Sequence, residues 1–83
     1  LPALTGERRE QLMKLVSEKL EEARIASRKA RDIVWKDVQT QERDGAISED
    51  EKFRAKDELQ KKMDHFNRDA DGIAEKKRME IKS

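Results

Sequence analysis

Basic side chains gather in one stretch of the first half of the chain. Arg24, Arg28, Lys29 and Arg31 stand between residues 23 and 31, where the sequence has no carboxylate. At about 100° per residue in a helix, Arg24 and Arg31 lie about 40° and 60° to the same side of Arg28. A guanidinium group can donate two hydrogen bonds at once to a phosphate. The three arginines are therefore a candidate phosphate-binding face.

A plainer reading of the same arginines stays open. They also fit solvated side chains, or ion pairs in which Glu21 or Glu22 meets a neighbour three or four residues on. The net charge is only +1, so binding to nucleic acid would depend on this local cluster. A second basic run, residues 76–78, is explained by the preference for cations in the last turn of a helix.

Other chemistry finds little support in the residues. Residues 67–72 resemble the start of a calcium loop, but position twelve is Arg78, where a bidentate Glu is needed. The chain has one histidine, His65, and no cysteine, so we expect no metal site. Without cysteine, the sequence also does not indicate whether the protein works in an oxidising or a reducing compartment. No Ser or Thr has an arranged base, and the carboxylates alternate with Lys and Arg. We expect no cofactor and no enzyme.

The high proportion of charged residues limits the kinds of structure that can hold these arginines. Charged residues make up 47% of the 83 residues and apolar residues 34%, against roughly 25% and 45 to 50% in an average soluble domain. Such a chain is either disordered or built of long helices with a narrow apolar stripe. No apolar run is long enough to span a bilayer, so a membrane is not an expected partner.

Periodicity favours helices. Thr5 is a suitable N-cap for a helix over about residues 5–44. Apolar or small residues recur in it at steps of three and four, on one side: Leu12, Val16, Leu20, Ala23, Ser27, Ala30, Val34 and Val38. The small residues in the middle let another helix come close. Trp35 is one residue off this stripe, and it either packs against a further segment or marks an exposed contact.

A turn at about residues 45–47 separates this helix from a second one at about residues 48–81. Gly45 suits the left-handed position after a helix, and Ser48 with Glu51 forms a capping box. The second stripe comprises Phe53, Leu59, Met63, Phe66, Ala70 and Ile73. Because the connection is short, we expect an all-α antiparallel helical hairpin.

The two stripes alone bury too little apolar surface to offset the entropy of ordering the chain. We therefore expect a further helix, supplied by a missing segment or by a second copy of the chain in a symmetric four-helix dimer. The first residue is Leu1 and not Met, from which we expect a fragment or a processed product.

Four stretches resemble the ribosome recycling factor family. Residues 1–9 are similar to the start of that family's second long helix, and residues 23–31 to its basic block. Residues 45–50 match its turn and cap, and residues 57–61 a motif of its third helix. The likeness covers all 83 residues in order, and the motifs together are specific.

The resemblance implies a partial three-helix-bundle domain over residues 1–83, with the family's first helix and inserted β domain absent. It implies a cytoplasmic, non-enzymatic translation factor that contacts large-subunit ribosomal RNA and, with elongation factor G, helps to split the ribosome after termination. By motif position Arg9, Arg28 and Arg31 correspond to RNA-contacting arginines. Arg28 and Arg31 are the stronger candidates, and Arg9, Arg24 and Lys29 are weaker ones. The chain departs from the family at Asp32, which replaces an arginine, and at residues 33–35, which replace a polar stretch. The alternative is a coiled-coil scaffold with no RNA role.

Overall fold

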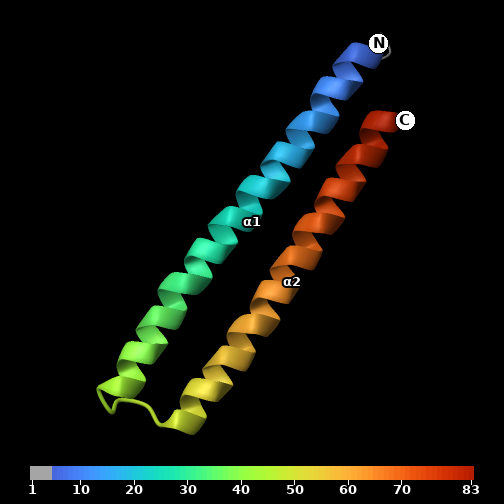
Figure 1. The fold of residues 1–83 in the computed structure, drawn as a ribbon. Helices are drawn as coiled ribbons and strands as arrows, with labels where there is room; N and C mark the ends of the chain where they lie inside the picture. Colours follow the sequence, from blue (N-terminus) through green and yellow to red (C-terminus); the bar gives the residue numbers. More distant parts are fainter. Residues whose placement is uncertain (1–4) are drawn as a thin grey trace.

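Two long helices side by side form the described part of the protein. A computed structural model describes residues 5–83, in which α1 spans Gly6–Arg43 and α2 spans Glu49–Lys82. The helices run antiparallel and make a rod of 63 × 16 × 15 Å, with the termini at one end and the turn at the other (Figure 1). The all-α helical hairpin is confirmed. The first four residues of the family-like stretch 1–9 lie outside the described residues.

Local signals at the helix ends explain where the helices begin and end. The Thr5 hydroxyl accepts a hydrogen bond from the Arg8 backbone N–H at 3.1 Å. At the turn, Gly45 has φ +81°, a left-handed conformation that costs glycine little. The Ser48 hydroxyl accepts from the Glu51 N–H at 3.1 Å, and the Glu51 carboxylate accepts from the Ser48 N–H at 3.4 Å. The predicted N-cap, left-handed glycine and capping box are therefore confirmed.

Small side chains bring the two helices together. Ser27 on α1 and Ala74 on α2 are the buried residues of their helices, with exposed fractions of 9% and 5%. The Ser27 hydroxyl donates to the Met63 sulfur at 3.2 Å across the contact. Ala30 was predicted to share this close approach, but it is exposed. Only part of the small-residue stripe faces α2.

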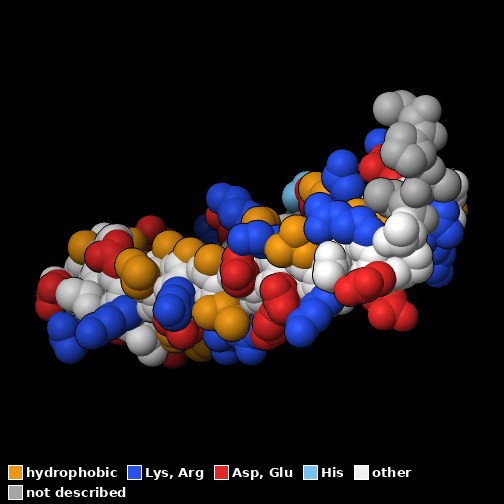
Figure 2. Space-filling model, turned by 90° about the horizontal axis from the view of Figure 1, so that it is seen from above, with side chains coloured by type: hydrophobic (Ala, Val, Ile, Leu, Met, Phe, Trp, Pro, Cys, Tyr) orange, Lys and Arg blue, Asp and Glu red, His pale blue; other side chains and the backbone are white. Residues whose placement is uncertain are grey.

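The other part of each stripe lines an open groove. A hollow of about 600 Å³ runs between the helices. Its walls include Leu15, Val16, Leu20, Phe66, Ala70 and Ile73. Phe66 and Ile73 remain 43% and 63% exposed, and Figure 2 shows hydrophobic side chains open to solvent among charged ones. Part of the apolar surface of each helix therefore stays exposed in the hairpin.

Trp35 packs against the second helix of the hairpin itself, which neither reading from the sequence anticipated. Its ring is half-buried, and the Lys52 and Lys56 ammonium groups lie 5.8 and 5.9 Å from the ring centroid. The contact arises because the antiparallel register places the first turns of α2 beside the last turns of α1. Among residues 5–83, no helix is long and apolar enough to cross a membrane.

Candidate nucleic-acid interface

The structure gathers three of the five candidate basic residues along one edge of α1. Arg24, Arg28 and Arg31 follow one another at helical spacing, and Arg28 lies about 140° around the helix from Ala23, which lines the apolar groove. At about 1.5 Å per residue the three span roughly 10 Å along the axis. Arg24 and Arg31 lie only about 100° and 80° from Ala23, so the guanidinium-bearing edge lies beside the apolar groove and next to α2.

Each of these arginines has a carboxylate beside it. Arg24 Nη2 donates to Asp71 Oδ1 of α2 at 2.6 Å. Arg28 Nη2 reaches Glu21 Oε1 at 3.4 Å, and Arg31 Nη2 reaches Asp32 Oδ1 at 3.2 Å. A second carboxylate oxygen of Glu21 lies 4.0 Å from Arg24, as the intrahelical alternative predicts.

These ion pairs are open to solvent. The arginine side chains are 40%, 54% and 41% exposed at positions 24, 28 and 31. Exposed pairs of this kind contribute roughly 0 to 1 kcal/mol. A phosphate that offers a bidentate contact to guanidinium can therefore compete with the carboxylates. The three arginines are therefore paired with carboxylates that a phosphate can replace at a small cost in free energy.

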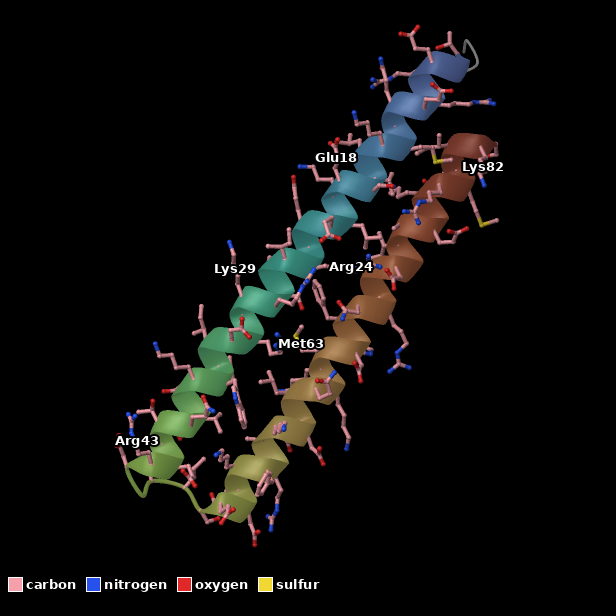
Figure 3. The ribbon with its side chains drawn as sticks, viewed as in Figure 1. Glu18, Arg24, Lys29, Arg43, Met63 and Lys82 are labelled. Carbon is pink, nitrogen blue, oxygen red and sulfur yellow. The ribbon has the colours of Figure 1, made fainter. Side chains whose placement is uncertain are left out.

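The other two candidates lie apart from this edge. Lys29 is exposed and points away from α2, whereas Arg24 extends toward α2 (Figure 3). Arg9 is fifteen residues before Arg24, roughly 22 Å along the axis. Its Nε is buried and has no hydrogen-bond partner among residues 5–83. The structure therefore does not join Lys29 and Arg9 to the guanidinium edge.

The second helix contributes groups to this edge that the sequence reasoning missed. Asp71 holds Arg24, and Arg78 Nη2 donates to the Ser17 hydroxyl at 3.4 Å. Both contacts join residues at nearly equal distances from the turn along the two helices. The predicted turn position was the signal that would have paired them. Within the described residues there is no group of three or more His, Cys, Asp or Glu side chains that fits a metal ion.

Comparison with known proteins decides the family. The model of the family described as ribosome recycling factor matches residues 1–81. The chain belongs to the ribosome recycling factor family. Among curated relatives, the ribosome-recycling factor of Lactobacillus delbrueckii subsp. bulgaricus is 44% identical over 81 residues, which are 98% of this chain and 44% of that protein.

Further recycling factors are similar to the same extent. That of Heliobacterium modesticaldum is 42% identical over 81 residues, 98% of this chain and 44% of the relative. That of Carboxydothermus hydrogenoformans is 42% identical over 83 residues, 100% of this chain and 45% of the relative. The chain thus spans less than half the length of the recycling factors it matches. No solved structure gives a significant match.

Proposed function

We propose that this protein acts as a translation factor of the ribosome recycling type in the cytoplasm. In this proposal the edge formed by Arg24, Arg28 and Arg31 contacts phosphates of large-subunit ribosomal RNA, and Arg9 and Lys29 add weaker contacts. Together with elongation factor G, the complete factor helps to separate the subunits after termination. Membership of the family supports the ribosome as the target.

The observation that carries the RNA contact is the row of exposed, weakly paired guanidinium groups on a stiff rod. Their carboxylate partners form solvent-exposed ion pairs that contribute little to stability, so a phosphate can take their place. Recognition of this type reads the shape and charge of the backbone, so its affinity falls as salt rises.

The apolar groove supports a proposal about the domain. We propose that residues 1–83 are two helices of a three-helix-bundle domain, and that a further helix covers the groove. The groove residues Leu20, Phe66 and Ile73 are the surface that such a helix would bury. In the full-length factor this is the family's first helix, beyond which its inserted β domain lies. For the 83 residues by themselves, a second copy takes that place in a homodimer.

The test is binding to isolated large ribosomal subunits over a salt series. A variant with Arg28→Glu and Arg31→Glu loses affinity and has a shallower salt dependence, because two phosphate contacts are removed and two charges reversed. The matched control carries Lys61→Glu and Lys62→Glu, two exposed cations of α2 with the same charge change. Circular dichroism checks that both variants keep their helices.

The competing function is a coiled-coil scaffold in which the arginines serve only solubility and ion pairing. The carboxylate beside each arginine is the observation that favours it. Equal affinity and equal salt slope for the arginine variant, the lysine variant and the unaltered protein would support the scaffold and reject the RNA contact.

A further inference from the structure

The hairpin carries a second hollow, separate from the apolar groove, at the side of Trp35. It has a volume of about 250 Å³. Its lining combines residues of both helices: Arg31, Asp32 and Trp35 from α1, and Lys56, Leu59 and Gln60 from α2. The volume is just below the roughly 300 to 1,000 Å³ of clefts that take drug-sized ligands. A single planar group such as one base fits this scale better than a larger ligand.

The hollow and the side chains beside it combine an aromatic ring with several cations and one carboxylate, Asp32, which pairs with Arg31. Trp35, the one tryptophan of the chain, supplies an aromatic face, and the half-buried Leu59 adds apolar surface beside it. Lys52 and Lys56 bring ammonium groups to within 5.8 and 5.9 Å of the ring centroid. An aromatic ring combined with flexible cations is the combination by which proteins hold unpaired bases and their phosphates.

The position of the hollow links it to the guanidinium edge. Arg31 belongs to both, and Trp35 follows it by one helical turn on nearly the same face. A strand whose phosphates lie along Arg24, Arg28 and Arg31 therefore reaches Trp35 at its next step. Of the two lysines over the ring, Lys52 is half-buried and Lys56 is exposed.

We propose that this hollow takes an unpaired nucleobase of RNA. The base stacks on Trp35, and Lys52, Lys56 and Arg31 neutralise the adjoining phosphates. Asp32 and Gln60 also line the hollow, and their polar groups are available to hydrogen-bond the edge of the base. This inference rests on the proposed RNA contact and deepens it, because it adds an unpaired base to a surface otherwise specific only for backbone.

Trp35 also makes the experiment direct, since the protein has no other tryptophan and no tyrosine. The probes are a stem-loop RNA with a single-stranded loop and a blunt duplex with the same stem. Trp35 emission is followed with unlabelled RNA, and affinity by anisotropy with end-labelled RNA. We expect the stem-loop to quench the emission and the duplex to leave it unchanged.

The variants are Trp35→Ala, Trp35→Phe and the control Ile33→Ala, an exposed apolar residue of the same helix. Trp35→Ala weakens stem-loop binding by about 5- to 150-fold, the loss typical of one stacked base. Trp35→Phe retains part of the affinity because it keeps a ring, and it serves if the alanine variant loses helicity. Ile33→Ala changes neither affinity, and none of the three changes duplex binding.

The outcomes separate the two proposals. If the Arg28 and Arg31 variant loses both RNAs while Trp35→Ala and Trp35→Phe keep full stem-loop affinity, the base site is wrong and the RNA contact stands. If Trp35→Ala loses the stem-loop while the arginine variant binds normally, base stacking on Trp35 stands, and both the guanidinium edge and the role of Arg31 in the base site are wrong. Absence of binding to either RNA overturns both.

Discussion

The bond between Arg24 and Asp71 gives the most informative perturbation. It is the shortest ion pair within residues 5–83, at 2.6 Å, and it joins the two helices. In the substitution Asp71→Asn, Arg24 loses its partner on α2 and keeps only Glu21 at 4.0 Å. A phosphate that binds the Arg24 guanidinium group then has to displace only Glu21.

The expected magnitude follows from the exposure of the pair. The side chains are 40% and 52% exposed, so solvent screens the pair and its contribution to stability is about 0.2 to 1 kcal/mol. The free energy of unfolding therefore falls by that amount. Affinity for large-subunit RNA rises by the same free energy, about 1.4- to 5-fold. If Arg24 gains a phosphate contact, the plot of log affinity against log salt steepens by about 0.7 to 0.9.

A matched control is available two residues away. Asp69→Asn gives the same change in net charge on the same helix, but Asp69 lines the apolar groove and pairs with His65 at 3.2 Å. Binding is measured for both variants between 50 and 200 mM salt, a range over which phosphate contacts change affinity strongly. Equal effects of the two substitutions, or weaker binding by Asp71→Asn, would refute the idea that Asp71 competes with RNA for Arg24.

Four further substitutions, one of them a control, test the fold by chemical denaturation. Ser27→Leu lowers the free energy of unfolding by about 1 to 3 kcal/mol because it overpacks the helix contact, whereas Ala30→Leu stays within about 0.5 kcal/mol because Ala30 is exposed; equal losses would place the contact elsewhere. Ser48→Ala removes the capping box and costs about 0.5 to 2 kcal/mol. Gly45→Ala forces a Cβ into the left-handed region at φ +81° and costs about 1 to 2 kcal/mol. An unchanged midpoint for either would contradict the turn geometry.

Local features of the fold were predictable because each depends on residues close in sequence. The caps at Thr5 and Ser48 and the left-handed Gly45 need only neighbours within one turn. The apolar stripes predicted helices, but not which part of a stripe faces the partner helix. Val34 belongs to the predicted stripe but is 46% exposed in the hairpin. The periodicity of apolar residues shows which side of a helix is apolar, but it does not show how many neighbouring helices cover that side.

The candidate site was predictable only in part, for the same reason. Helical angles alone placed Arg24, Arg28 and Arg31 on one edge, since all three belong to one helix. The contact with Asp71 depends on the register of α2 against α1. The lysines over Trp35 depend on it too. The register of the two helices is fixed by side-chain packing between them. The apolar pattern of one helix alone does not determine that register.

The proposed contact of the guanidinium edge with ribosomal RNA is tested most directly by local cleavage of that RNA. The chain has no cysteine, so one introduced cysteine carries a tethered source of hydroxyl radicals without competition. Ser17→Cys places it eleven residues before Arg28, about 20° away around α1, and Ile73→Cys places it in the apolar groove. With the protein bound to large subunits, we predict strong cleavage of the RNA from position 17 and little from position 73. Strong cleavage from position 73 with none from position 17 would contradict the account.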